Sequence, residues 1–171
     1  IKTGLVGSYN LENILAAVAI GLHFRVRPDH ILNTLQGWSS QNNRSQRIET
    51  DSNILIMDAY NANPSSMEVA LRHLAGLKNG GKIAILGDMF ELGQDSEKEH
   101  QAIADLSASL GIENLYLVGE AFSGIRTEAK QFRTFEDLAE SLKTHPINGP
   151  ATLLIKASRG MALERVLEYI G

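Results

Sequence analysis

Residues 53–87, with the sequence NILIMDAYNANPSSMEVALRHLAGLKNGGKIAILG, contain the pattern that decides the fold. An apolar run over 53–57 ends at Asp58, which favours a buried strand with a carboxylate at its end. Asn63 and Pro64 then match the N-cap and the first position of a helix. The expected buried stripe of this helix is Met67, Ala70, Leu71 and Leu74. A second apolar run closes the stretch, so the order strand, helix, strand predicts a unit of a parallel sheet.

The same alternation continues to the end of the chain. Further strands are expected over 82–86, 115–118 and 151–155, and further helices over 96–110, 134–142 and 161–170. Short apolar strands separated by helices predict an α/β fold whose parallel sheet is covered on both faces. Ligands of such sheets bind at the carboxyl ends of the strands, so the polar residues that follow each strand are the candidates for function.

The first part of the chain has a different pattern. Asn10 begins one helical pattern, and Pro28 begins a second that ends at Gly37. The polar, turn-rich residues that follow, up to Arg44, indicate a linker. We therefore expect a short helical unit over residues 1–37 and an α/β domain over 38–171.

Composition and charge argue against several classes of protein and of site. Lys and Arg number 16 against 20 Asp and Glu, which gives a net charge of −4 and argues against a protein that coats nucleic acid. The absence of cysteine excludes disulfides and thiolate metal sites. No apolar run approaches the roughly 20 residues that a membrane span needs. The chain also begins without Met or a signal-peptide pattern, as expected for a piece of a longer protein.

Two segments favour a nucleotide site. Asp58 stands where a carboxylate could accept hydrogen bonds from a ribose, and the following helix start offers backbone N–H groups to an anion. Asn10 and Asn13 are three residues apart, so both amides lie on one face of a helix start, where each offers the donor and acceptor that adenine needs. The alternative for both segments is helix capping without a ligand.

Other candidates follow later strands. Asp88 and Glu91 could face a cleft or be solvated, and His100, among charged neighbours, is predicted to lie on a solvated helix face. The strand-end residues Lys156, Ser158 and Arg159 suggest a clamp for phosphate or carboxylate; the alternative is capping with exposed charges. Arg47 precedes the first strand, with Arg44 close by.

Taken together and in this order, these segments resemble the Mur ligases, from about Gly7 to the end of the chain. The most specific element is Tyr60-Asn61-Ala62-Asn63-Pro64, which is similar to the branch of the family that adds D-alanyl-D-alanine. Two departures are Gln46 and Ala157, which stand where glycine is common. The phosphate-binding loop of the family, Gly-x-x-Gly-Lys-Thr/Ser, does not occur in these 171 residues.

The resemblance implies a cytoplasmic three-domain enzyme that uses ATP and Mg²⁺ to join D-alanyl-D-alanine to a UDP-N-acetylmuramoyl-tripeptide through an acyl phosphate. Residues 1–37 would be the last helices of the central ATPase domain, which would also supply the metal ligands. The rest would be a Rossmann-like C-terminal domain with a mostly parallel sheet. The chain alone would be inactive.

The resemblance also implies roles for individual residues. Asn10 and Asn13 would bind the adenine, and Arg47 and Asp58 would reach the nucleotide and serve catalysis. The expected substrate-binding residues are Asn61, Asn63, Asp88, Lys156, Ser158 and Arg159. The alternatives are a sister ligase, either another Mur ligase or a folylpolyglutamate-type synthetase, or a non-catalytic nucleotide-binding module.

Overall fold

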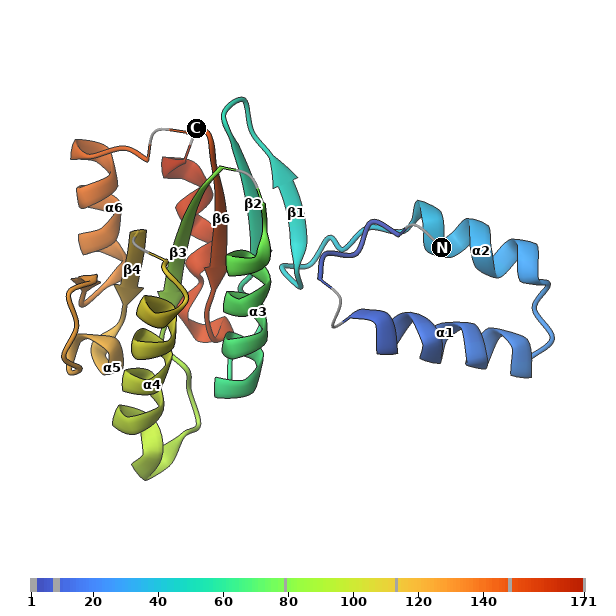
Figure 1. The fold of residues 1–171 in the computed structure, drawn as a ribbon, viewed down its shortest axis with the longest axis horizontal. Helices are drawn as coiled ribbons and strands as arrows, with labels where there is room; N and C mark the ends of the chain where they lie inside the picture. The colour runs from blue at the N-terminus through green and yellow to red at the C-terminus, as the bar shows by residue number, and fades with distance from the viewer. Residues whose placement is uncertain (1–2, 8–9, 79, 113, 148, 171) are drawn as a thin grey trace.

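The fold is built on a six-stranded sheet with the order β1-β2-β6-β3-β4-β5 (Figure 1). The structure is a computed structural model that describes residues 3–7, 10–78, 80–112, 114–147 and 149–170. The strands are β1 (Gln46–Glu49), β2 (Asn53–Asp58), β3 (Gly81–Gly87), β4 (Asn114–Val118), β5 (Lys130–Phe132) and β6 (Ala151–Lys156). β1 is antiparallel to β2, and the other strand pairs are parallel. The predicted mostly parallel sheet is therefore confirmed.

Helices cover both faces of this sheet, as predicted. One face packs against α3 (Pro64–Gly76), α4 (Ser96–Ser109) and α5 (Glu120–Ser123), and the other against α6 (Phe135–Thr144) and the 3-10 helix η4 (Leu163–Tyr169). Two short 3-10 turns, η2 (Gly93–Asp95) and η3 (Arg159–Met161), complete the domain. The stripe predicted for α3 is the one that is buried: Met67, Ala70, Leu71 and Leu74.

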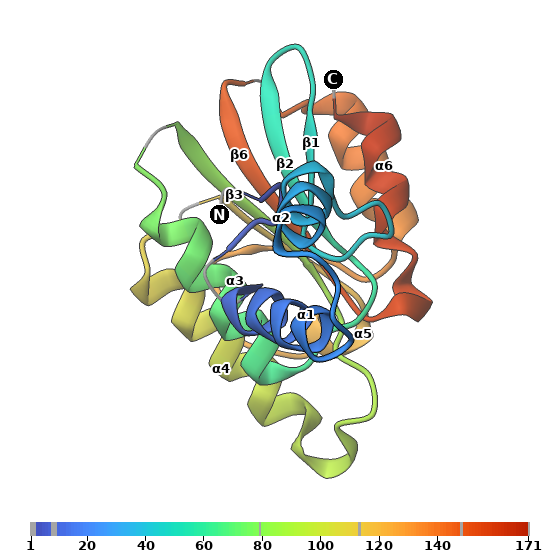
Figure 2. The same cartoon turned by 90° about the vertical axis from the view of Figure 1, so that its right-hand side faces the viewer.

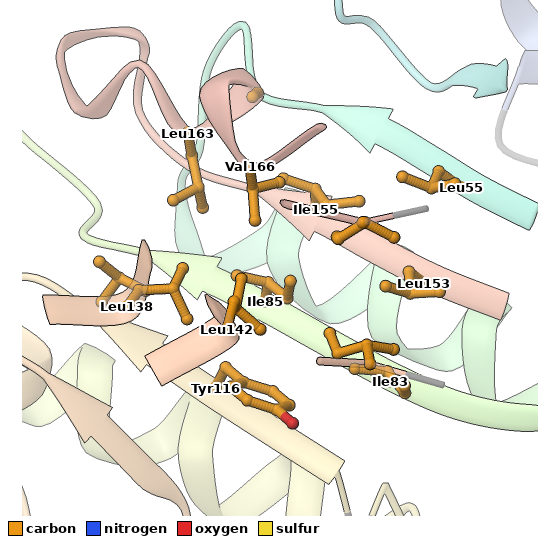
Figure 3. Packing of buried hydrophobic residues seen from close by; sticks show 14 of the residues in the cluster. Leu55, Ile83, Ile85, Tyr116, Leu138, Leu142, Leu153, Ile155, Leu163 and Val166 are labelled. Carbon is orange, nitrogen blue, oxygen red and sulfur yellow. The ribbon is translucent and has the colours of Figure 1, made fainter. Parts of the chain in front are cut away.

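Successive strand residues point to opposite faces and divide the core in two. Leu55 packs in the cluster under α6 and η4, while its neighbour Ile56 packs in the cluster under α3 and α4. Figure 3 shows the first cluster, in which Leu138 and Leu142 of α6 lie over strand residues such as Ile85. Every residue of β6 is buried, because this strand lies at the middle of the sheet with helices on both sides.

Some elements were not predicted from the sequence. β1 and β5 are short strands of four and three residues at the two sheet edges, and α5 has only four residues. The helix expected over 161–170 is two 3-10 segments instead of an α-helix. They are separated at Ala162, whose left-handed φ of 47° interrupts helical geometry.

The first part of the chain forms the predicted pair of helices, α1 (Leu11–His23) and α2 (Pro28–Gly37). In Figure 1 this hairpin projects to one side of the sheet, and Figure 2, viewed from that side, shows α1 in front of α3. Neither helix has a buried residue. Large exposed side chains on and after α1 are Leu11, Leu15, Ile20, Leu22 and Phe24. Among the described residues, no helix is long and apolar enough to cross a membrane.

The parallel pairing brings the ends of three strands together. Asp58 at the end of β2 lies opposite Lys156 at the end of β6, and Lys156 also lies opposite Leu86 of β3. The polar residues that follow these strands consequently share one edge of the sheet, where the sequence predicted a site.

Candidate functional site

A cavity of about 580 Å³ opens at the carboxyl end of β2 and β6, within the size range of small-molecule sites. Its walls come from the start of α1, the turn before β1, the segment after β2 and the start of α3. Six residues predicted to be functional line it: Asn10, Asn13, Asp58, Asn61, Asn63 and Lys156. Sequence positions 10 and 156 therefore meet at one pocket.

The floor of the pocket is a nearly buried ion pair. The Nζ of Lys156 donates to Oδ2 of Asp58 at 2.5 Å and to the backbone carbonyl of Asn61 at 3.1 Å. Only 3% of the Lys156 side chain and 17% of the Asp58 side chain is exposed. The backbone N–H of Ser45 donates to the other Asp58 oxygen at 2.9 Å. A buried ammonium needs such partners, so Lys156 holds Asp58 and the following turn in place.

The turn after β2 leads into α3 through a capping box. The Asn63 side chain accepts a hydrogen bond from the Ser66 N–H at 2.9 Å, and the Ser66 hydroxyl accepts one from the Asn63 N–H at 3.1 Å. The capping role predicted for Asn63 is therefore confirmed. The Asn61 side chain accepts from the N–H of Ala62 at 2.9 Å, which orders the turn. The start of α3, where helical N–H groups are concentrated, faces the pocket through Ser65 and Ser66.

The two amides at the start of α1 lie together, as their spacing predicted. Asn13 donates to the side-chain oxygen of Asn10 at 3.1 Å, and Asn10 donates to the carbonyl of Val6 at 2.8 Å. Val6 in turn packs against the core under α3. This chain of contacts ties the amide pair to the wall of the pocket.

The structure places Arg44, and not Arg47, in the lining of this pocket. Arg47 lies on β1, pairs with Glu49 and lines a separate hollow with Asn53 and Pro150, at the opposite end of the sheet. Arg44 lines the pocket instead, with its guanidinium carbon 3.8 Å from the centre of the Tyr60 ring. The sequence contained both arginines, but the start of β1 decides which of them faces the pocket.

Asp88 lies outside the pocket lining and caps a helix, and its predicted substrate contact stays a prediction. Its two carboxylate oxygens accept hydrogen bonds from the N–H groups of Ala121 and Phe122, both at 3.0 Å, and its exposure is only 5%. It caps the start of α5 next to Gly119, whose φ is 126°. A Cβ added to Gly119 would lie 2.3 Å from the carboxylate carbon, so glycine permits this close approach.

Ser158 and Arg159 also lie outside the pocket lining. The buried Ser158 hydroxyl accepts from the N–H of Phe90 at 2.8 Å, so it holds the loop after β3. Arg159 is exposed and pairs with Glu164 at 2.6 Å. Its assignment to the amino-acid substrate stays a prediction.

His100 is fully buried, so its predicted place on a solvated helix face is wrong. Its Nε2 accepts a hydrogen bond from the N–H of Met89 at 3.0 Å, and its Nδ1 lies 2.7 Å from the carbonyl of Ser96. The ring also meets Phe122 edge-on. His100 thus supports the loop after β3 from beneath.

Among the described residues, no three His, Asp or Glu side chains gather closely enough to hold a metal ion. The groups that the pocket does present are amides, hydroxyls, a guanidinium, and one carboxylate paired with the Lys156 ammonium. Amides can pair with a nucleobase, a carboxylate can accept from a ribose, and a guanidinium can bind phosphate. This set of donors and acceptors fits a nucleotide.

The family model and the curated relatives that this chain matches both belong to the Mur ligases. Residues 43–166 match the family model for the Mur ligase, glutamate ligase domain. The UDP-N-acetylmuramoyl-tripeptide–D-alanyl-D-alanine ligases of Bacillus subtilis and Escherichia coli are 31% and 32% identical, over 96% and 97% of this chain. The chain spans 38% of the length of each of these relatives.

Solved structures agree with this result. MurF from Acinetobacter baumannii superposes with a TM-score of 0.81 at 29% identity, over 95% of this chain and 37% of that one. MurF from Thermotoga maritima in complex with ADP gives a TM-score of 0.80 at 25% identity, over 96% and 38%. Folylpolyglutamate synthase from Mycobacterium tuberculosis, at 14% identity and a TM-score of 0.64, shares the fold. The chain therefore belongs to the Mur ligase family, and its α/β sheet with the covering helices is the family's C-terminal domain.

Proposed function

We propose that this chain is part of an ATP-dependent ligase that adds D-alanyl-D-alanine to UDP-N-acetylmuramoyl-tripeptide in peptidoglycan synthesis. The observation that carries the proposal is the pocket in which Asn10 and Asn13, from the helical start, face Asp58 and Arg44, from the α/β domain. The similarity to UDP-N-acetylmuramoyl-tripeptide–D-alanyl-D-alanine ligases extends over both parts, 97% of this chain for the Escherichia coli relative. The complex of Thermotoga maritima MurF with ADP supports a nucleotide as the ligand.

The proposed nucleotide contacts follow from the positions of the side chains in the pocket. The amide pair at the start of α1 reads the edge of the adenine, and Asp58 accepts from the ribose hydroxyls. Arg44 takes over the role that the sequence assigned to Arg47, because its guanidinium lies in the pocket and can donate to phosphate oxygens. Asn61 and Asn63 line the same space and are proposed to contact substrate.

Residues 1–37 are proposed to be the last helices of the central domain. Their exposed apolar side chains, such as Leu15 and Ile20, match helices that pack against more protein. The phosphate-binding loop and the Mg²⁺ ligands would lie in that domain, and the 171-residue chain alone would not turn over. Residues 38–171 would close over the nucleotide, supplying Arg44 and Asp58 and excluding water from the acyl phosphate.

The chemistry proposed for the complete enzyme is amide formation. ATP phosphorylates the tripeptide carboxylate, the D-alanyl-D-alanine amine attacks the acyl phosphate, and inorganic phosphate leaves from the tetrahedral intermediate. Phosphoryl transfer depends chiefly on positioning and charge stabilisation. The Lys156–Asp58 pair and the capped turn after β2 provide a rigid base for that positioning.

A substrate panel on the full-length protein tests the function. With ATP and UDP-N-acetylmuramoyl-tripeptide present, we expect D-alanyl-D-alanine to stimulate ADP and phosphate release, while single amino acids and diaminopimelate do not. The isolated 171-residue chain serves as the negative control. Turnover with glutamate and a folate would indicate a folylpolyglutamate-type synthetase, and turnover with a single amino acid would indicate another Mur ligase. No turnover in any combination would favour the non-catalytic module.

The two neighbouring arginines give a second test. Arg44→Ala in the full-length protein is expected to lower kcat/KM about tenfold, equivalent to near 1.4 kcal/mol, because a phosphate-facing guanidinium is lost. Arg47→Ala is the matched comparison, since its side chain pairs with Glu49 away from the pocket, and a change of no more than about twofold is expected. Steady-state kinetics with varied ATP measure both. The reverse ranking would restore the role that the sequence alone assigned to Arg47.

A further inference from the structure

A sharply bent turn presents Arg44 to the pocket. Its two neighbours, Asn43 and Ser45, have left-handed φ values of 56° and 50°, which are uncommon for residues other than glycine. Two contacts hold this conformation. The N–H of Tyr60 donates to the Asn43 carbonyl at 3.1 Å, and the N–H of Ser45 donates to Asp58 at 2.9 Å. The segment after β2 therefore fixes the backbone on both sides of Arg44.

The same segment also contacts the Arg44 side chain. The guanidinium carbon lies 3.8 Å from the centre of the Tyr60 ring, within the range of a cation–π interaction. Tyr60 is 43% exposed, so its ring is not a core side chain. The backbone that carries the ring follows directly after Asp58 and Ala59 at the end of β2, and the hydrogen bond from its N–H to the Asn43 carbonyl fixes it beside Arg44.

Arg44 forms no ion pair with a carboxylate of the described residues. Six other arginines pair with Asp or Glu: Arg27, Arg47, Arg72, Arg133, Arg159 and Arg165. For Arg44, no carboxylate of the described residues lies within ion-pair distance. Stacking on an aromatic ring uses the face of the guanidinium and leaves its N–H donors, which lie in the guanidinium plane, for an anion.

We propose that Tyr60 is a positioning residue that acts through Arg44. The ring holds the guanidinium in one position in the pocket before the nucleotide binds. Binding of a phosphate to Arg44 then costs less side-chain entropy. This inference rests on the proposed function, in which Arg44 binds the nucleotide. It assigns to Tyr60 no contact of its own with the ligand.

The test is a double-mutant cycle in the full-length protein, with KM for ATP and kcat measured separately. Tyr60→Leu keeps apolar bulk but removes the ring, and it is expected to raise KM for ATP about fivefold, the loss of an exposed cation–π contact. Tyr60→Phe keeps the ring and is expected to stay within about twofold of the parent protein. In the Arg44→Ala background, Tyr60→Leu is expected to change KM no further, because its effect passes through the missing guanidinium. The melting temperature of each variant shows that the fold is kept.

Each other outcome has a distinct meaning. Additive effects of Arg44→Ala and Tyr60→Leu would overturn the inference, because Tyr60 would then contact the ligand independently. A normal KM for Tyr60→Leu beside a raised KM for Arg44→Ala would overturn it too, while the proposed function would stand. Normal KM values for both would remove Arg44 from the nucleotide site, and the inference would fall with it. A loss in Tyr60→Phe equal to that in Tyr60→Leu would assign the effect to the hydroxyl and contradict a stacking role.

Discussion

Asp58→Ala in the full-length protein is expected to lower kcat/KM about 100-fold, near 2.7 kcal/mol of transition-state stabilisation. The carboxylate is proposed to contact the nucleotide, and it also connects three parts of the pocket. One of its oxygens accepts from the Ser45 N–H at 2.9 Å, and the other binds Lys156, whose ammonium also holds Asn61. Loss of one side chain would thus release the turn that carries Arg44 and the turn before α3. Steady-state kinetics with varied ATP measure the effect.

This variant also leaves the Lys156 ammonium without its carboxylate partner. Only 3% of that side chain is exposed, so we expect a loss of about 3 kcal/mol in unfolding free energy, at the low end for a broken buried pair. Lys156→Met in the same chain would remove the uncompensated charge and restore most of the stability. Activity should stay low in the double variant. Recovery of activity along with stability would show that Asp58 serves the fold and not the reaction.

Asp51→Ala provides a matched control for the loss of one carboxylate. Asp51 is exposed and lines the hollow at the opposite end of the sheet. Its replacement is expected to change kcat/KM by less than twofold and stability by less than about 0.5 kcal/mol. An equal loss of activity in Asp51→Ala and Asp58→Ala would mean that net charge, and not the pocket, controls the rate.

The features that were predicted correctly from the sequence are helix caps and the spacing of side chains along helices, because both depend only on residues close together in the chain. Asn63 caps a helix through its side chain, as the sequence indicated, since short polar side chains satisfy the first N–H groups of a helix. Thr134 caps α6 in the same way. The stripe from Met67 to Leu74 was predicted because apolar spacing reports which face is buried. The amide pair of Asn10 and Asn13 was predicted on the same ground of helical spacing.

The edges of the sheet were harder to predict for a physical reason. β1 has the sequence Gln-Arg-Ile-Glu, with a single apolar residue, and is half covered because it lies at an edge. β1 is a strand because it pairs with β2, and this pairing depends on a different segment of the chain. Four residues with one apolar side chain show no alternating pattern from which the strand could be predicted. That pairing also fixes which arginine faces the pocket, so Arg44 and Arg47 could not be told apart before the register of β1 was known.

His100 shows how local charge can hide a buried position. Its neighbours Glu97 and Lys98 are exposed and suggested a solvated helix face. The helix buries His100, Ile103, Ala104 and Ser107, which recur at the spacing i, i+3, i+4 and i+7. Two of these four buried residues, His100 and Ser107, are polar, so the spacing of apolar residues alone does not indicate the buried face. The buried face is predicted by the same spacing when polar residues that can hydrogen-bond within the protein are counted with the apolar ones.

The burial of His100 leads to a second large expected effect. His100→Ala is expected to lower the unfolding free energy of the 171-residue chain by about 3 kcal/mol, measured by urea denaturation. Two losses add up to this value. The substitution leaves a cavity beside Phe122 where the imidazole had packed, and it leaves the N–H of Met89 without the acceptor that now lies 3.0 Å away. Lys98→Ala, two residues earlier on the exposed face of the same helix, is expected to change the unfolding free energy by no more than about 0.5 kcal/mol.

His100→Leu separates the two losses, because leucine fills much of the space but accepts no hydrogen bond. An unpaired buried N–H costs about 1–3 kcal/mol, so this variant is expected to fall between His100→Ala and the parent protein. In the full-length protein, the same variants should leave KM for ATP unchanged, since His100 supports the loop after β3 and not the pocket that contains Asp58. A leucine variant as stable as the parent would mean that the hydrogen bond to Met89 contributes nothing. A raised KM for ATP would mean that the loop after β3 contacts the nucleotide.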